Sequence, residues 1–214
     1  MIVARRKQLP VIATLIAVIA VSAWWITRNL IQPKFNVKLH QRIGQVMAEE
    51  TEKLIAGKGA ILLITLAPKQ SPVLDVQVSA FHKAIQRHGG ISVIETVTLN
   101  AAQKAGPGQG LSVDEFLALL ERPAKADAIV SFVGTPDPRD PKISNRGKTA
   151  GPKIVAETRT RGKIKTLFRN QLLHTAIVPR YDFPAPGTKN PSTPREWFDL
   201  SFQVVRSNKP PPEE

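Results

Sequence analysis

The 214-residue sequence contains no cysteine, which excludes disulfide bonds, thiolate metal sites and cysteine nucleophiles. Acidic residues are also scarce: there are 17, against 30 lysines and arginines, and none precedes Glu49. The formal net charge of +13 favours anionic partners such as lipid headgroups, envelope polymers, acidic proteins or nucleic acid. A charged surface that serves only solubility explains the same excess equally well.

Metal and catalytic motifs are missing as well. The two histidines closest in sequence, His82 and His88, lie six residues apart and would occupy different faces of a helix. There is no Gly-x-Ser-x-Gly elbow, and the glycine-rich segment 106–110 lacks the ending of a phosphate-binding loop. We therefore expect no enzyme, no cofactor and no metal. Paired carboxylates in a cleft, or a histidine with a perturbed pKa, would reopen the question.

One long apolar run stands near the N-terminus. Residues Leu9–Ile26 read LPVIATLIAVIAVSAWWI and contain no charge, and 18 helical residues at about 1.5 Å each would just cross a membrane. Trp24 and Trp25 stand at its C-terminal end, where tryptophan prefers the membrane interface. The run predicts a transmembrane helix within a signal anchor of residues 1–27. The rest of the chain would then lie on the extracytoplasmic, periplasmic side of the cell membrane.

A cleaved signal peptide is the alternative interpretation of the same run. Basic residues precede it, and Val21-Ser22-Ala23 fits a small-residue cleavage site. Cleavage near Ala23 would give a periplasmic or secreted protein. The apolar continuation from Trp24 to Ile26 favours the anchor, but both interpretations export the domain.

The rest of the chain divides into three parts. Residues 28–58 predict a linker that leads into a helix, either a stalk or a first helix packed on the domain. Residues 59–205 predict the folded domain, and the proline-rich residues 206–214 a disordered tail. Within the domain, apolar runs predict strands that alternate with helices, at 60–66, 91–97, 128–134, 153–157 and 175–179.

This alternation predicts an α/β fold with a single doubly wound, mainly parallel five-stranded sheet and flanking helices. Residues 163–173 fit either a helix or the second strand of a hairpin that turns at Arg161-Gly162. The upstream alternation of strands and helices favours the helix. The last apolar segment, from Trp197 to Val204, fits an edge strand.

Residues 59–134 resemble one lobe of the type I periplasmic sugar-binding proteins. The resemblance is carried by GAILLITLAPKQSPVLDVQVSAFHKAIQRHGGISVIETVTL and by FLALLERPAKADAIVSFVG, in which strands, glycine-ended helices and polar loops follow one another in the same order. Those proteins close two lobes over a ligand, whereas this chain has residues for one. The resemblance therefore implies a flavodoxin-like fold and an exported protein rather than sugar binding.

Candidate binding residues follow from the predicted sheet, because parallel sheets bind ligands outside the carboxyl ends of their strands. Four of the residues in these loops are cationic, and Ser71 would open a helix whose free N–H groups favour an anion. The predicted ligand-binding residues are Lys69, Gln70, Ser71, Thr135, Asp137, Arg159, Arg161, Arg180 and Tyr181. The window Arg139–Arg169 adds ten basic residues against two acidic ones.

The functional hypothesis is a membrane-tethered binding module. It would use this basic strand-end edge to recognise an anionic ligand, an envelope polymer or a partner protein. The alternative is a structural component of a cell-envelope assembly that has no small-molecule ligand. Nucleic acid is disfavoured as a partner, because the domain is predicted to be exported and aromatic side chains for base stacking are sparse.

Overall fold

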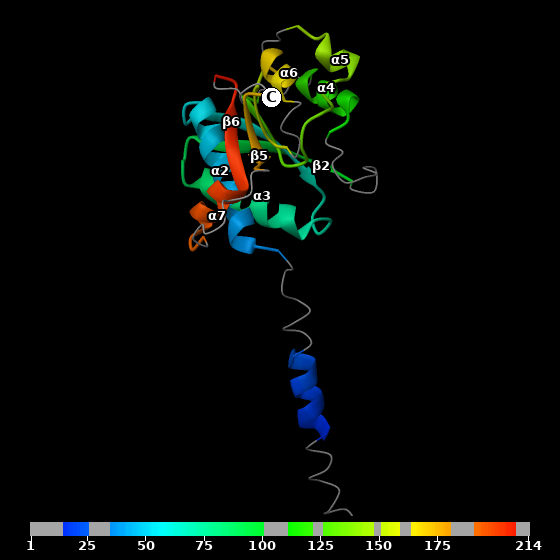
Figure 1. Ribbon diagram of the computed structural model, residues 1–214, viewed down its shortest axis with the longest axis vertical. Coiled ribbons are helices and arrows are strands. Elements are labelled where there is room, and N and C mark those ends of the chain that lie inside the picture. The colour runs from blue at the N-terminus through cyan, green and yellow to red at the C-terminus, as the bar shows by residue number, and fades with distance from the viewer. Residues whose placement is uncertain are drawn as a thin grey trace, which may run out of the picture. The chain divides into compact units, whose positions relative to one another are not determined.

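The computed structural model describes residues 15–25, 35–100, 111–121, 126–147, 151–158, 164–180 and 191–208. The chain divides into a unit of residues 1–36 and a larger unit that begins at Val37. In the first unit, residues 15–25 form a helix, drawn blue in Figure 1. Among the described residues, no helix combines the length and apolar character needed to cross a membrane. Leu9–Thr14 and Ile26 of the predicted span lie outside the described residues.

The larger unit begins with helix α2 (Val37–Leu54), which packs into the domain. Its side chains Ile43, Met47 and Ala48 are fully buried and join the same apolar cluster as residues of the sheet. Of the two arrangements that the sequence left open for this segment, the structure has the packed first helix. The segment can pack because its apolar residues recur at helical spacing on one face.

The described residues of the larger unit form a six-stranded sheet in the order β2-β1-β3-β4-β5-β6. The first five strands are parallel, and β6 pairs antiparallel with β5. The strands are β1 (Gly59–Leu66), β2 (Ile91–Leu99), β3 (Ala128–Ser131), β4 (Lys153–Glu157), β5 (Thr175–Pro179) and β6 (Phe202–Arg206). The α/β class and the mainly parallel sheet are confirmed, whereas the predicted count of five strands was wrong.

The sixth strand arises because the last apolar segment divides in two. Thr193 and Glu196 form a reciprocal capping box that begins helix α7 (Pro194–Ser201), and a proline follows the cap. The helix ends at Phe202, whose backbone is extended, and the chain returns along β5 as β6. The prediction of one edge strand from Trp197 to Val204 is therefore corrected to a helix followed by an edge strand.

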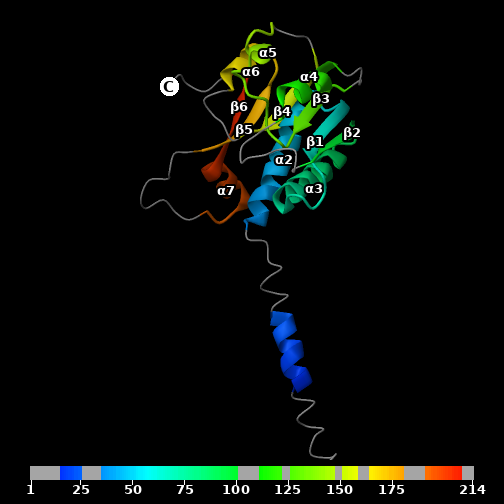
Figure 2. The ribbon, with the colours of Figure 1, turned by 90° about the vertical axis from the view of Figure 1, so that its right-hand side faces the viewer.

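Two helical layers cover the sheet, as Figure 2 shows. Helix α2, helix α3 (Pro72–Gln86) and α7 contribute to the core on one face; α4 (Val113–Glu121), α5 (Pro141–Ser144) and α6 (Lys165–Arg169) contribute to the core on the other. Helix α6 lies where the sequence allowed a helix or a hairpin strand, so the helix is the correct alternative.

The central strand β1 is buried on both faces, as its continuous apolar run predicts. Ile61 and Leu63 belong to the core beneath α2 and α3, and Leu62 and Ile64 to the core beneath α4, α5 and α6. All four side chains are at most 1% exposed. Successive residues of a strand point to opposite faces, so one strand connects the two cores.

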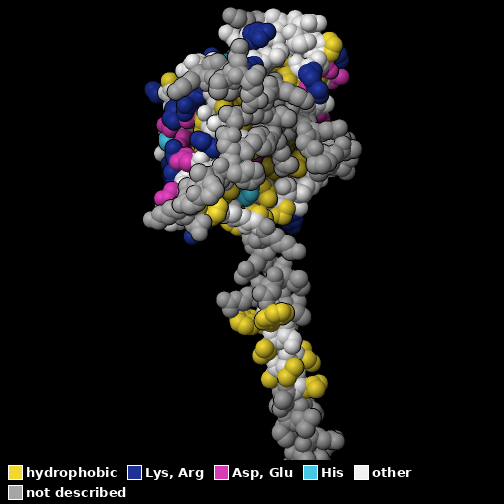
Figure 3. All heavy atoms as spheres, viewed as in Figure 1, with side chains coloured by type: hydrophobic (Ala, Val, Ile, Leu, Met, Phe, Trp, Pro, Cys, Tyr) yellow, Lys and Arg dark blue, Asp and Glu magenta, His cyan; other side chains and the backbone are white. Residues whose placement is uncertain are grey.

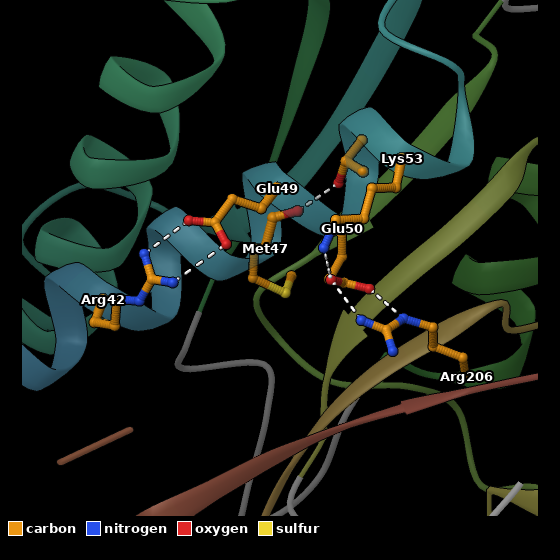
Figure 4. Close-up of polar contacts among 7 residues, drawn as sticks. Arg42, Met47, Glu49, Glu50, Lys53 and Arg206 are labelled. Carbon is orange, nitrogen blue, oxygen red and sulfur yellow. Dashed lines mark hydrogen bonds and ion pairs between the residues drawn. The ribbon is translucent and has the colours of Figure 1, made fainter. Parts of the chain in front are cut away.

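One close backbone contact and one buried ion pair fix α2 in the domain. A Cβ atom at Gly44 would collide with the backbone carbonyl oxygen of Gln77, so α2 approaches α3 at a distance that only glycine permits. At the other end of α2, the buried Glu50 accepts hydrogen bonds from Arg206 of β6 and from Lys53 (Figure 4). Arg42 and Glu49 form a further ion pair along the helix, with 2.7 Å between Nη1 and Oε1.

Candidate functional site

The strand order places the expected ligand-binding position at the carboxyl ends of β1 and β3. The chain turns from β1 to β2 on one side, and β3, β4 and β5 follow on the other. The carboxyl ends of β1 and β3 therefore flank the point where the winding direction reverses, which is where open α/β sheets bind ligands. The loops at this point are residues 67–71 after β1 and residues 132–140 after β3.

The loop after β1 is held in a defined conformation. Lys69 has a φ of 68°, in the left-handed region that residues other than glycine seldom adopt. Its backbone N–H donates to Oδ2 of Asp75 at 3.1 Å, and the N–H of Gln70 donates to the carbonyl of Ala67 at 3.2 Å. The Lys69 side chain is exposed and has no acidic partner among the described residues. The loop thus presents one ammonium group from a fixed backbone.

Gln70 and Ser71 mainly support this loop. The side-chain amide of Gln70 donates to Oδ1 of Asn100, at the end of β2, over 3.1 Å. Ser71 Oγ accepts from the N–H of Leu74 at 3.4 Å, and Ser71 is the N-cap of α3 with Pro72 behind it. Both contacts join the first loop to its neighbours. Ser71 occupies the N-cap position that the sequence predicted.

The loop after β3 contains Thr135 and Asp137. Thr135 is half-buried and precedes a buried proline, and Ser131 Oγ donates to the carbonyl of Gly134 at 2.7 Å. Asp137 accepts from the backbone N–H of Arg139 at 3.0 Å and from its guanidinium at 2.8 Å. The hydrogen bonds that the Arg139 guanidinium donates to Asp137 raise the pKa of Arg139. Asp137 is therefore engaged in a local turn, a role that the prolines on either side of it also favour.

Arg180 lies away from these two loops. Its Nε donates to the carbonyl of Phe202 at 3.1 Å, which ties it to the start of β6. Strand β4 separates β5 from β3, so about 10 Å divides the two strand ends at the usual spacing. The predicted site residues Arg159, Arg161 and Tyr181 lie outside the described residues. The structure thus brings Lys69 and Thr135 to the same boundary but does not bring Arg180 to it.

The basic window Arg139–Arg169 is partly neutralised by acidic neighbours. Three of its described cations have such partners: Arg139 with Asp137, Lys142 with Asp114 at 2.6 Å, and Arg146 with Glu121 at 3.6 Å. Two of these pairs tie the segment around α5 to α4. On the face in Figure 3, lysine and arginine side chains mostly lie beside aspartate and glutamate rather than forming one uniform patch.

Glu157 is a polar residue at this edge that is absent from the predicted ligand-binding residues. It ends the central strand β4 and is partly buried, with its Oε2 atom enclosed. Thr158 follows it and is 4% exposed. Its position as the last residue of a strand buried on both faces could have marked Glu157 as a candidate. Such a position places a side chain at the edge where parallel sheets bind ligands.

His174 has the perturbed pKa that would reopen an enzymatic interpretation. Burial, aided by the charge of Lys153, lowers the pKa of His174 to about 4. However, His174 precedes β5 at the opposite, amino edge of the sheet, and its Nδ1 accepts the backbone N–H of Ile154 at 3.1 Å. A neutral ring is required to accept that bond, so the shift reflects a structural role. The described residues also hold no group of acidic residues or histidines suited to a metal ion.

Comparisons with known proteins find solved structures of similar fold rather than a close relative in sequence. No family model and no curated protein match the sequence. GanP, a glucose-galactose binding protein from Geobacillus stearothermophilus, is similar at a TM-score of 0.53 and 12% identity, over 81% of this chain and 62% of that one. A sugar ABC transporter sugar-binding protein from Bacillus halodurans gives 0.53 and 14%, over 79% and 62%.

A third similar structure is a solute-binding protein from Agrobacterium vitis bound with alpha-D-tagatopyranose. Its TM-score is 0.52 at 19% identity, over 79% of this chain and 57% of that one. This chain therefore spans less than two thirds of the length of these neighbours. The structural similarity covers more of the chain than residues 59–134, the stretch in which the sequence suggested a resemblance. The resemblance is confirmed at the level of fold: the domain shares the fold of the type I periplasmic sugar-binding proteins over part of their length.

Proposed function

We propose that this protein is an extracytoplasmic binding module that holds a small anionic ligand at the boundary between the carboxyl ends of β1 and β3. The observation that carries the proposal is the conformation of Lys69. A positive φ at a lysine costs about 1 kcal/mol or more, and such strain is concentrated at ligand-binding loops. Here the strained backbone of Lys69 presents a cation from the loop where doubly wound sheets bind their ligands.

The surroundings of Lys69 favour an anion over a neutral ligand. The ammonium group has no ion-pair partner among the described residues, and the loop leads directly into the first turn of α3, whose positive dipole end is offset only in part by Asp75. Thr135 stands across the boundary and offers a hydroxyl group. Binding rather than catalysis is proposed, because Asp137 is engaged with Arg139 and His174 is engaged at the opposite edge of the sheet.

The neighbours with this fold include a glucose-galactose binding protein and a sugar-binding protein of an ABC transporter, which supports a binding function of this general kind. A sugar phosphate would combine the hydroxyl groups of such ligands with the negative charge that Lys69 favours. A neutral sugar is the competing ligand, and titration can distinguish the two.

The test uses Lys69→Asn, which removes the charge while keeping a residue that tolerates positive φ. Glucose 6-phosphate, inorganic phosphate and glucose are titrated into the protein by calorimetry. We expect the first two to bind and the variant to lose at least about tenfold in affinity, or about 1.4 kcal/mol. The matched control is Lys58→Asn, which removes one exposed lysine from the opposite edge. Equal losses in the two variants, or preference for glucose, would contradict the proposal.

We further propose that the module is attached to the membrane by residues 9–26. The helical residues 15–25 carry exposed apolar side chains, including Trp24 at 59% and Trp25 at 63%. Retention in the pellet after alkaline carbonate extraction, with an intact N-terminus by mass spectrometry, is the expected result. A protein that begins just after Ala23 would instead establish the cleaved, periplasmic or secreted form.

A structural role in an envelope assembly is the second candidate. Strand β2 is at the edge of the described sheet, and Ile94 on it is 50% exposed, at a register shift where β2 bulges against β1. Exposed edges with apolar residues are common contact surfaces. Cross-linking in intact cells from a cysteine introduced at Ile94 would capture a neighbour under this alternative. A chain that stays uncross-linked but binds glucose 6-phosphate would support the binding module.

A further inference from the structure

A groove separates α2 and α3 on the outer side of their layer. Its volume is about 460 Å³, within the range of small-molecule sites. The two helices lie side by side in Figure 2. Residues from both helices line the groove: Gln41, Gln45, Asp75, Val76, Ser79, Ala80, Lys83, Ala84 and Arg87. This groove runs along α3, whereas the site proposed above lies at the strand ends.

Lys83 and Arg87 form the cationic end of the groove. They stand four residues apart on α3, so their charges face the same side of the helix and repel each other. Both are exposed, and neither forms an ion pair with any residue in the described ranges. An anion bound between them would remove this repulsion.

The remaining polar side chains match hydroxyl groups. Gln45 Oε1 accepts from Arg42 at 3.3 Å, which leaves its amide N–H groups to donate. Asp75 accepts the N–H of Lys69 through Oδ2, and its carboxylate can accept further hydrogen bonds. Gln41 and Ser79 can each donate and accept. A groove that offers both donors and acceptors suits sugar hydroxyls, because each hydroxyl also does both.

The floor of the groove is apolar. Val76, Ala80 and Ala84 supply it, and Gly44 lets the two backbones approach, with an ideal Cβ there only 3.1 Å from the Cβ of Ala80. Small side chains at a close helix crossing leave room above them for a flat ring. The C–H faces of a sugar ring would pack against this floor while its hydroxyls reach the polar walls.

We propose that the α2–α3 groove binds an acidic oligosaccharide, with a carboxylate or phosphate group between Lys83 and Arg87 and hydroxyl groups toward Gln41, Gln45 and Asp75. Asp75 disfavours a dense polyanion such as nucleic acid, and the described residues that line the groove include no aromatic side chain on which bases could stack. An acidic peptide is the competing occupant, because its backbone N–H groups can also donate to these acceptors, and the experiment includes tetraglutamate for this reason. The inference goes beyond the function proposed above and does not depend on the Lys69 site.

The experiment titrates the full chain with an acidic tetramer, a tetrasaccharide that carries one glucuronic acid on three neutral sugars, and, in parallel, with neutral maltotetraose. We expect the acidic tetramer to bind, and Lys83→Gln combined with Arg87→Gln to weaken it at least about tenfold. Lys38→Gln combined with Lys58→Gln is the matched control, since it removes two exposed lysines outside the groove. It should change the affinity by less than about threefold.

A second variant tests the groove without changing charge. Ser79 is exposed, so Ser79→Trp should fold normally, fill the groove and abolish binding of the acidic tetramer. Lys69→Asn keeps the backbone N–H that Asp75 accepts, so it should leave this binding within about twofold, which separates the groove from the strand-end site. The proposal is overturned if the control pair weakens binding as much as the groove pair, or if Ser79→Trp binds the acidic tetramer normally. It is also overturned if maltotetraose, tetraglutamate or an octathymidylate binds more tightly than the acidic tetramer.

Discussion

Arg206 of β6 donates two hydrogen bonds to Glu50 of α2, at 2.6 and 2.8 Å, and joins positions 156 residues apart in the sequence (Figure 4). Glu50 is 3% exposed. Burial alone would raise the pKa of its carboxyl group, but the hydrogen bonds from Arg206 and Lys53 hold that pKa below its ordinary value. The pair thus fixes the first helix of the domain to its last strand.

Replacing Arg206 should therefore destabilise the domain. We expect Arg206→Met to lower the free energy of unfolding by about 2 kcal/mol, because a buried carboxylate loses its bidentate partner while Lys53 remains. The measurement is urea denaturation at pH 7. Arg195→Met, which breaks the exposed pair between Arg195 and Asp199, should cost less than about 0.5 kcal/mol.

The same pair predicts an acid dependence. Because the pKa of Glu50 is lower in the folded state, its contribution to stability is present above the unfolded pKa and is lost as the pH falls through the folded one. In Arg206→Met this part of the acid destabilisation should shrink. Parallel stability curves for the two proteins between pH 3 and pH 7 would argue against the assignment.

His174 predicts a separate pH dependence. Its pKa is lowered to about 4, below the ordinary value of 6.5, so the unfolded chain binds a proton that the folded domain excludes. Stability should be complete above about pH 6.5 and fall as the pH drops toward 4. His174→Asn can still accept the N–H of Ile154 but cannot titrate. Thermal melts of this variant should show a weaker pH dependence over the same window, and an unchanged dependence would contradict the prediction.

The close crossing of α2 and α3 predicts the effect of one methyl group. Gly44→Ala would place a Cβ against the carbonyl oxygen of Gln77, so we expect a loss of about 1–3 kcal/mol. Gly147→Ala is the matched control, since no atom lies within 4 Å of the added Cβ there. Similar melting temperatures for the two variants would show that the helices can separate without cost.

At the candidate site, we expect a substitution of Asp137 to leave the ligand affinity almost unchanged. Its carboxylate is bound to the Arg139 backbone and guanidinium on an exposed loop. Asp137→Asn should therefore change the affinity for glucose 6-phosphate by less than about twofold and the stability by less than about 0.5 kcal/mol. A tenfold change in affinity would return Asp137 to the ligand-binding residues.

Local patterns in the sequence predicted much of the fold. The apolar run of β1 indicated a strand buried on both faces, and Ser71 followed by Pro72 indicated the start of α3. Ser112 and Glu115, which stand in the Ser-x-x-Glu pattern of a capping box, form its reciprocal hydrogen bonds at 3.0 and 3.2 Å. These features depend on residues a few positions apart, so a sequence pattern contains the information.

The sequence by itself determined the α/β class, the parallel strands and the edge of the sheet where a ligand is expected. Only the tertiary structure decided which residues meet there and elsewhere. It engaged Asp137 with Arg139, placed Arg180 two strands from Thr135 and three strands from Lys69, and formed the α2–α3 groove. The physical reason is that these contacts depend on strand order and helix packing, which bring together side chains that no local spacing relates.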